Sequence, residues 1–422
     1  MAPDMTASRS QYDVIVVGGG PAGSLTAWHL AKAGLRVLIL EAKSFPRVKA
    51  CGGGLQVRVM QAMPLDIAPV VRGTIHDVTL TFGLRGAHTR HYAEPLVHTV
   101  LRSEFDEHLV RMAQTAGAVL RERICVRNYN AGADGRVTVQ TDQGQFTADC
   151  LVGADGANSV VRAELNSRET YFWQTALYAE VPEHLIDPKA IDRQRMCLDW
   201  GTLPSGYAWA FPKDGFVNVG AGGPTRLARE LRPYILRFLE ANRLVRPEAL
   251  AQIRFTGHQL PTWTRRARLA RGSVVLVGDA AGLVEPLTGE GIYFACESAA
   301  IAARAITRAL KAGARDFTAY SGDLLSAVRG ELLSARMLMR LSLMFPARMY
   351  ALFRDNDQAW RTFCRVLRGE CSFQDLRNEI LGPLRMASAV VDFISRMLES
   401  RLLDRKTALT CPPLAPVSGD GR

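Results

Sequence analysis

The stretch near the N-terminus from residue 12 to residue 41 most constrains what this chain can fold into. It opens with an apolar, β-branched run at 14–17, which is typical of a parallel strand buried on both faces. A glycine-rich turn follows, then apolar residues at helical spacing as far as Gly34, and then a second apolar run at 37–40 that ends at Glu41. This order predicts the first strand, helix and strand of a Rossmann-type sheet.

The turn itself has the spacing of a dinucleotide-binding fingerprint. Gly18, Gly20 and Gly23 form G-x-G-x-x-G, which allows a tight turn, close approach of the backbone to a pyrophosphate and close helix packing. Ala22 lies at the start of the helix, whose positive end favours phosphate. Glu41 is placed to accept hydrogen bonds from ribose hydroxyls, which favours FAD or NAD over NADP. The fingerprint alone does not choose between FAD and NAD.

Composition narrows the class of protein. A chain of 422 residues with 48% hydrophobic residues is long enough for two or three domains with a large core. A net charge of +11 favours an anionic partner: a phosphorylated substrate, an acidic redox protein or a membrane surface. Nucleic acid is not expected, because no recognition motif is present. Eight cysteines without paired spacing indicate neither a metal site nor a disulfide framework, and favour a cytoplasmic location.

The patterns along the chain predict how the domains are arranged. Strand patterns at 118–126, 135–147 and 150–156 and again at 274–277 extend the first unit, so we assign 11–165 and 270–312 to one discontinuous domain. Alternating, aromatic-rich segments indicate an antiparallel sheet in an inserted substrate domain at 166–269, with parts of 70–100. Residues 313–409 are expected to be helical. Residues 1–10 and 410–422 are expected to be disordered, and no apolar run reaches the ~18 residues of a membrane span.

Three further segments could contribute to a site. Cys51 is followed by three glycines, including Gly52 and Gly54, so this stretch is a loop that needs unusual backbone angles or admits a flat ligand. On its residues alone, Cys51 is better explained as an inert loop cysteine than as a reactive thiol.

In the second segment Tyr207, Trp209 and Phe211 alternate, so their rings share one face of a strand, which is either core or the wall of a pocket. In the third, Asp279 ends a strand and can hold ribityl hydroxyls. Gly291 and Ile292 then offer helix-start amides to an anionic ring edge.

The segment 332–353 has two open interpretations. Arg336, Arg340 and Arg348 lie among Leu, Met and Phe, with Pro346 as a break. The segment is either a pair of amphipathic helices that pack on the protein or a basic surface that contacts lipid.

With these motifs the chain resembles the geranylgeranyl reductase family, within the para-hydroxybenzoate hydroxylase-like superfamily of FAD-dependent oxidoreductases, from residue 12 to about residue 383. The fingerprint, the L-R-x-x-F-D motif at 101–106, the G-A-D-G motif at 153–156 and the G-D motif at 278–279 belong to the whole superfamily. The K-A-C-G-G-G loop at 49–54 and the P-x-x-Y-x-W-x-F-P-K strand at 204–213 are more specific to the family. Phe373 departs mildly from the family, where a tyrosine is expected.

The resemblance implies a cofactor and its contacts. It implies FAD bound by Ala22, Glu41, Cys51, Gly52, Gly54, Arg102, Val126, Asp279, Gly291 and Ile292, and no metal. Arg102 would neutralise a phosphate, and Val126 would meet adenine through its backbone. Cys51 becomes the candidate catalytic residue, and Tyr207, Trp209 and Phe211 become the candidate pocket wall.

The resemblance also implies a reaction: reduction of isolated C=C bonds in a polyprenyl chain, by hydride from flavin N5 with coupled protonation. Cys51 would donate the proton or position the isoalloxazine ring. The substrate would be a prenylated small molecule or lipid, and the external reductant NAD(P)H or reduced ferredoxin. The enzyme would be cytoplasmic, with peripheral contact at the inner face of the membrane left open. The alternatives are an FAD-dependent monooxygenase of hydroxylase or halogenase type, and a flavoprotein that modifies or matures a protein partner.

Overall fold

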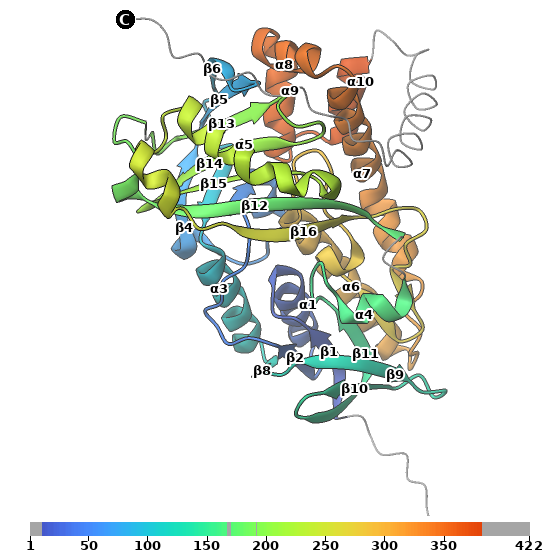
Figure 1. Cartoon of the computed structure of the whole chain (residues 1–422). Helices are drawn as coiled ribbons and strands as arrows, with labels where there is room; N and C mark the ends of the chain where they lie inside the picture. The colour runs from blue at the N-terminus through green and yellow to red at the C-terminus, as the bar shows by residue number, and fades with distance from the viewer. Residues whose placement is uncertain (1–10, 167–169, 191, 382–422) are drawn as a thin grey trace, which may run out of the picture. The chain divides into compact units, whose positions relative to one another are not determined.

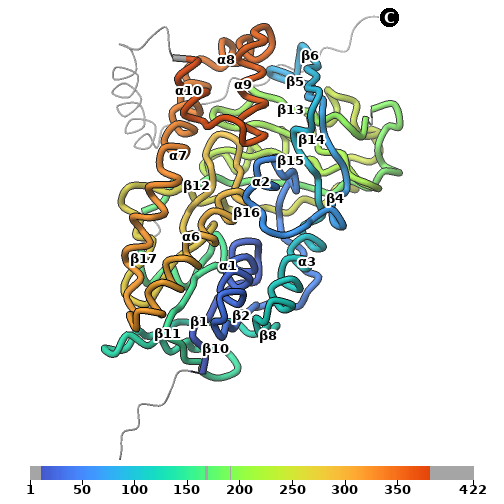
Figure 2. The backbone as a smooth tube through the Cα atoms, turned by 180° about the vertical axis from the view of Figure 1, so that it is seen from behind, coloured from blue at the N-terminus to red at the C-terminus, as the bar shows by residue number. Residues whose placement is uncertain are grey.

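The computed structural model describes residues 11–166, 170–190 and 192–381, and the contacts discussed below lie within residues 11–377. Two large sheets and a small one carry the fold, with α1 (Pro21–Lys32), α3 (Arg102–Thr115) and α6 (Ile292–Lys311) between the two large sheets (Figures 1 and 2). The segments 1–10 and 410–422, which the sequence predicts to be disordered, lie outside the described residues. Residues 382–409 of the expected helical region do so too.

The first large sheet is built around β1, which pairs in parallel with β2 on one side and with β11 on the other. β8 and β18 continue the parallel order, and the short β17 closes one edge antiparallel. The hairpin of β9 and β10 extends β11. The strands are β1 (Tyr12–Val17), β2 (Val37–Glu41), β8 (Val119–Glu122), β9 (Val126–Ala131), β10 (Val137–Thr141), β11 (Gly144–Gly153), β17 (Ala270–Arg271) and β18 (Val274–Leu276).

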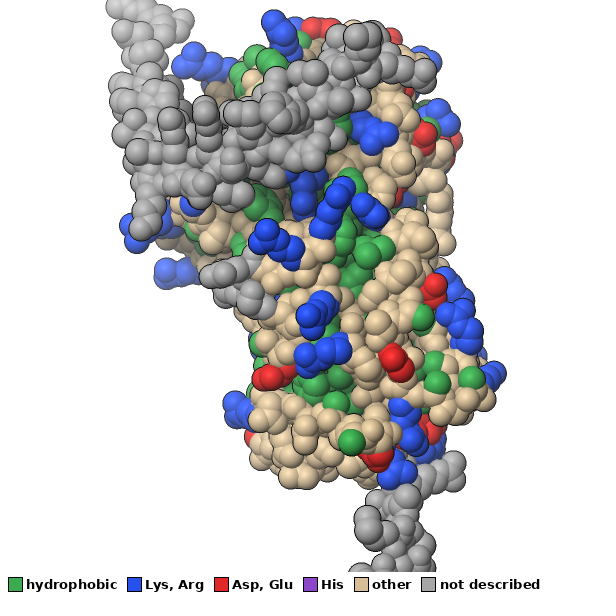
Figure 3. Space-filling view, turned by 90° about the vertical axis from the view of Figure 1, so that its right-hand side faces the viewer, with side chains coloured by type: hydrophobic (Ala, Val, Ile, Leu, Met, Phe, Trp, Pro, Cys, Tyr) green, Lys and Arg blue, Asp and Glu red, His purple; other side chains and the backbone are tan. Residues whose placement is uncertain are grey.

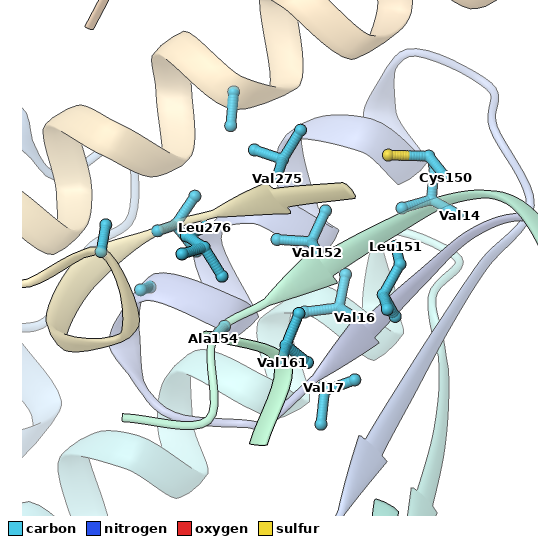
Figure 4. Close-up of a cluster of buried hydrophobic side chains, with 14 of the residues drawn as sticks. Val14, Val16, Val17, Cys150, Leu151, Val152, Ala154, Val161, Val275 and Leu276 are labelled. Carbon is cyan, nitrogen blue, oxygen red and sulfur yellow. The ribbon is translucent and has the colours of Figure 1, made fainter. Parts of the chain in front are cut away.

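The core of this sheet confirms the apolar runs seen in the sequence. Side chains from β1, β11 and β18 pack together, and those of Val16, Val152 and Val275 are fully buried (Figure 4). The single strand expected over 118–126 is wrong, because the chain forms β8 and β9 instead. Arg123 lies between them with φ of 60°, a left-handed conformation that interrupts an extended strand.

The second large sheet has the order β16-β12-β15-β14-β13-β5-β6. Its neighbours are antiparallel, as the sequence predicts, except that β13 pairs with β5 in parallel, because β5 enters from an earlier part of the chain. The helix α5 (Ala228–Ala241) packs on β15. The strands are β5 (Asp77–Phe82), β6 (Arg85–His91), β12 (Phe172–Pro182), β13 (Arg195–Trp200), β14 (Tyr207–Lys213), β15 (Phe216–Pro224) and β16 (Thr256–Thr262).

Smaller elements join these sheets to a helical region. A third sheet, β3-β7-β4, contains β3 (Gly54–Gln56), β4 (Val71–Ile75) and β7 (Val97–Val100), and α2 (Val57–Ala62) follows β3. The short α4 (Val160–Leu165) and the 3₁₀ turn η6 (Gly278–Ala281) flank the first sheet, with four other 3₁₀ turns in the connections among the described residues. The helical region contains α7 (Tyr320–Met344), α8 (Pro346–Asp355), α9 (Asp357–Leu367) and α10 (Phe373–Leu381).

The predicted fold class is therefore confirmed: an α/β protein with a Rossmann-type sheet, a second, mostly antiparallel sheet and a helical C-terminal region. The break at Pro346 is also confirmed, since α7 ends two residues earlier and α8 begins at this proline. None of the described helices combines the length and the apolar content needed to cross a membrane.

The core of the first sheet gives a stability prediction. Val16→Ala removes two methyl groups from a side chain with 0% exposure, and should lower the free energy of unfolding by about 2 kcal/mol. Val119→Ala is the matched control, because Val119 lies in the same sheet but is 41% exposed, and it should change stability by under about 0.5 kcal/mol. Urea unfolding measures both, and equal losses would contradict the assigned core.

Candidate functional site

The glycine turn after β1 brings backbone against backbone. A Cβ on Gly23 would lie 1.9 Å from the carbonyl oxygen of Gly18, and a Cβ on Gly18 would lie 2.5 Å from the carbonyl oxygen of Ala154. Neither position accepts a side chain. Gly20 differs, since its nearest neighbour would be Arg47 Nη2 at 3.6 Å, which leaves its backbone open to a ligand. The turn therefore has the form that a pyrophosphate requires.

Glu41 ends β2 beside this turn. Its Oε2 accepts a hydrogen bond from the Gly19 N–H at 2.9 Å, and its Oε1 accepts one from the Lys43 N–H at 3.0 Å. A carboxylate has about four acceptor positions, so capacity remains for ribose hydroxyls. The Ile124 N–H donates to the Glu41 carbonyl oxygen at 3.0 Å, which brings the segment before Val126 to the same end of the sheet. The candidate ribose and adenine contacts thus lie together.

A buried carboxylate joins two cations near the turn. Asp106, with 0% exposure, accepts two hydrogen bonds from Arg102, at 2.7 and 2.9 Å, and a third from Arg47 Nη1 at 3.0 Å. Arg47 Nε is 3.4 Å from Glu41 Oε2 and forms no hydrogen bond there. The cluster of Arg47, Arg102 and Asp106 carries a net positive charge, which suits an anionic ligand.

Arg102 also reaches the candidate catalytic loop. It lies near Cys51, which is among the groups that act on its guanidinium. Burial lowers the pKa of Arg102, but Asp106 and Cys51 outweigh it and raise this pKa above its ordinary value. Arg102 is therefore a permanent cation between the phosphate end of the site and Cys51.

The loop after β18 brings two predicted cofactor contacts, Asp279 and Gly291, close together. The third predicted contact of this region, the Ile292 amide, already has a partner within the protein. A Cβ on Gly278 would lie 2.7 Å from the Cβ of Ala22, and a Cβ on Gly291 would lie 3.2 Å from Asp279 Oδ1. The Ile292 N–H, however, donates to Glu290 Oε1 at 2.6 Å, so this helix-start amide already has a carboxylate partner. The interaction of the Ile292 amide with an anionic ring edge therefore stays a prediction. In the structure the partner of this amide is Glu290.

The cysteine loop lies directly against the aromatic face of β14. A Cβ on Gly52 would be 3.2 Å from the Phe211 ring and 3.3 Å from Trp209 Nε1, and a Cβ on Gly54 would be 3.3 Å from Phe211. The ring centroids of Tyr207 and Trp209 are 5.7 Å apart, and those of Trp209 and Phe211 are 6.5 Å apart. The prediction that the three rings share one face is confirmed, and the glycine loop packs against that face.

A hydrogen-bond network fixes this contact. Asn218 accepts from Trp209 Nε1 at 2.8 Å and donates through Nδ2 to the Cys51 carbonyl oxygen at 3.2 Å and to Glu180 Oε1 at 3.0 Å. The same Glu180 oxygen accepts from the buried Lys213 ammonium at 3.0 Å. The Gly53 N–H donates to Cys51 Sγ at 3.3 Å, so both the backbone and the thiol of Cys51 are held.

Tyr207 is oriented differently from the other two rings. Its hydroxyl donates to the Thr288 carbonyl oxygen at 2.5 Å, in the loop before α6. Burial, with a smaller contribution from Glu285 and Glu290, raises the pKa of Tyr207 above its ordinary value. The phenol is therefore a neutral group that joins β14 to this loop.

Sequence reasoning missed four residues of this region: Arg47, Lys49, Asn218 and His258. Arg47 and Lys49 lie in the loop that was singled out for Cys51, and two cations within four residues of a thiol were an available signal. Asn218 and His258 come from β15 and β16, and nothing in their local sequence points to the site.

These residues fit FAD. An open glycine turn, an acid with spare acceptor capacity and a net positive cluster are joined by a hydrogen bond and ion pairs, and the cluster lies near a glycine loop with a thiol. A family model described as an FAD binding domain matches residues 11–183.

The comparison with known proteins agrees with this geometry. The chain is 31% identical to a protein of Methanothermobacter thermautotrophicus named digeranylgeranylglycerophospholipid reductase 2, over 72% of this chain and 80% of that relative. The chain belongs to the geranylgeranyl reductase family of FAD-dependent oxidoreductases. Among solved structures, a geranylgeranyl bacteriochlorophyll reductase-like protein from Thermoplasma acidophilum matches with a TM-score of 0.72 at 21% identity, over 88% of this chain and 95% of that one.

The same fold serves other chemistry. The flavin-dependent brominase Bmp2 matches with a TM-score of 0.68 at 19% identity, over 89% of this chain and 99% of that one. Fold similarity therefore does not separate reductases of this family from halogenases, and the reaction has to be argued from the site.

The position of Glu41 yields a binding prediction. Glu41→Arg places a cation where two N–H groups and the ribose donors need an acceptor, and should weaken FAD binding by roughly 10- to 100-fold. Glu41→Gln keeps one acceptor oxygen and should lose less. Fluorescence titration of FAD into the apoprotein measures both, with circular dichroism to check folding. An unchanged affinity in Glu41→Arg would contradict the ribose assignment.

Proposed function

We propose that this protein reduces isolated C=C bonds in a polyprenyl chain. The observation that carries the proposal is the direct packing of the Cys51 loop against Trp209 and Phe211, in a chain of the geranylgeranyl reductase family. A thiol and an apolar aromatic face at one place provide a proton donor and a binding surface for a hydrocarbon chain. Bound FAD, once reduced, supplies the hydride.

The residues of the chain have three tasks in this reaction. Trp209 and Phe211 bind the hydrocarbon and exclude water, since neither ring face carries a polar group. Asn218 holds Trp209 and the Cys51 backbone in one arrangement. Cys51 gives its S–H proton to the alkene carbon next to the one that receives hydride, because an unpolarised double bond needs both.

The reductant is proposed to be external. The sequence contains one dinucleotide fingerprint, which the FAD site uses, so NAD(P)H would bind transiently or a reduced ferredoxin would deliver electrons. Enzyme whose flavin has been reduced chemically beforehand does not need this external reductant for its first turnover.

Cys51 gives the main test of the reaction. Cys51→Ala should bind FAD normally but slow the anaerobic, substrate-dependent oxidation of reduced flavin by roughly 10²- to 10⁴-fold, the usual contribution of a general acid. Stopped-flow absorbance with a panel of polyprenyl substrates measures the rate, and mass spectrometry should find products heavier by two hydrogens.

Trp209→Ala is the comparison, because it removes pocket surface without removing the thiol. It should act mainly on substrate binding, with a raised KM. Full turnover in Cys51→Ala would remove the proton-donor role but keep the family reaction. Turnover that requires dioxygen, with oxygen or halogen in the product, would instead establish the oxygenase alternative. Protein partners without small-molecule turnover would favour the maturation alternative.

We also infer peripheral contact with a membrane, through a narrower surface than the sequence suggested. Many apolar side chains of 332–353 are buried in the protein, including Leu332, Met337, Leu338, Met339 and Leu341. Phe345, at the junction of α7 and α8, is 46% exposed, with Arg348 stacked on it at 5.6 Å. Figure 3 shows basic side chains among hydrophobic ones on one face of the molecule. An apolar substrate, the +11 net charge and this exposed ring support the proposal.

Membrane contact is tested by sedimentation with anionic liposomes. Binding should occur at low salt and fall as salt is raised, because the attraction is screened. Phe345→Ser should weaken it, whereas Val119→Ser, which changes a similarly exposed residue of the first sheet, should not. Equal binding by both variants, or none at low salt, would contradict this surface.

A further inference from the structure

Two basic side chains meet at the wall of the candidate site. Lys49, two residues before Cys51, lies with its Nζ 2.5 Å from Nε2 of His258, which comes from the edge strand β16. Both residues are half-buried, and the Lys49 ammonium is largely removed from water. The two nitrogens form a hydrogen bond when only one of them is charged, since two charged groups would repel each other at this distance.

The pair faces the groups that define the site. The charges that act on the Lys49 ammonium come from three parts of the chain. They are Arg102 and Asp106 of α3, Asp279 of η6, and Cys51 of the loop that also carries Lys49. Asp279, Lys49 and Arg102 act on His258. The pair therefore borders both the proposed proton donor and the proposed cofactor contacts.

These surroundings decide which member holds the proton. Burial lowers the pKa of Lys49 to about 8, with Arg102 acting in the same direction and Asp279, Cys51 and Asp106 opposing it. Burial, and then the charge of Lys49, lower the pKa of His258 to about 4. Near pH 7 the Lys49 ammonium thus donates to a neutral His258, and the pair loses its proton as the pH rises through about 8.

We propose that Lys49 and His258 hold one proton for the reductase site and return it to Cys51 after each turnover. This inference rests on the proposed function, in which Cys51 gives up its thiol proton. In the reducing step the alkene gains a hydride and the Cys51 proton, and Cys51 is left as a thiolate. A proton then moves from the Lys49 ammonium to that thiolate, which leaves a neutral amine and a neutral thiol. Lys49 regains a proton from water on the His258 side, so the cycle balances without another reagent.

The structure gives a reason for such a pair. Once a hydrocarbon chain covers the half-buried Cys51, direct reprotonation of this thiol by solvent is hindered. Arg102, the other cation beside Cys51, does not release a proton in a protein. Lys49 is the cation of this cluster that can do so near neutral pH.

A substitution at Lys49 that keeps its charge but removes its titratable proton separates proton transfer from simple electrostatic attraction. Lys49→Arg retains a cation that does not titrate, Lys49→Met removes the cation, and Lys43→Met changes an exposed lysine of the same loop as the control. Flavin absorbance of the resting, FAD-loaded proteins is followed from pH 6 to pH 10. Wild type and Lys43→Met should show a transition near pH 8, and neither Lys49 variant should show it. His258→Phe removes the acceptor of the ammonium and should move the transition to lower pH.

Kinetics test the transfer itself. With excess dithionite to keep the flavin reduced and a polyprenyl substrate under anaerobic conditions, the ratio of the first turnover rate to later rates should rise at least tenfold in Lys49→Arg. A charge-only role predicts rescue by Lys49→Arg and an unchanged ratio, which would overturn the proposal. A pH 8 transition that persists in Lys49→Met, or is absent from wild type, would also overturn it. If no prenyl substrate is reduced while the transition behaves as expected, the proposed function fails and the proton-holding pair is upheld.

Discussion

The site depends on one buried anion. Asp106 has no exposure to water, and a carboxylate in that position is tolerated only because Arg102 and Arg47 bind it. Through these two cations the carboxylate links the glycine turn and Glu41 at one end to Cys51 at the other. The loop 44–50 and the start of α3 are therefore held in mutual register by charge pairing as well as by the apolar packing of Phe45 and Phe105, and their positions determine where the thiol lies.

The second constraint is the way in which the mostly antiparallel sheet is attached to this cluster. Asn218 contacts the Cys51 backbone, the Trp209 indole and Glu180 at once, so β12, β14 and β15 are tied to the cysteine loop by one amide. Because both its donor and its acceptor atoms are used, a residue of similar size without an amide would leave buried partners unsatisfied. The aromatic face and the thiol thus form a single unit, although they come from segments more than a hundred residues apart.

Features that depend on neighbouring residues could be predicted from the sequence. Features that depend on pairing between distant segments of the chain could not. The strand, turn, helix and strand of 12–41 were readable because β-branched runs and glycine spacing act within a few residues. The common face of Tyr207, Trp209 and Phe211 followed from strand alternation alone. The parallel pairing of β13 with β5 was not readable, because it depends on where β5 enters the sheet. Asn218 and His258 were missed for the same reason, since their partners lie far away in the chain.

Gly52 and Gly54 face Phe211 with backbone alone, and a single added carbon at either would come within about 3.3 Å of that ring. The separation between the loop and β14 is thus set by the thickness of one aromatic ring, with almost no spare distance. On the proposed function, in which this ring binds hydrocarbon, a smaller side chain at position 211 would widen the space beside the loop, because the two glycines have no side chain left to remove.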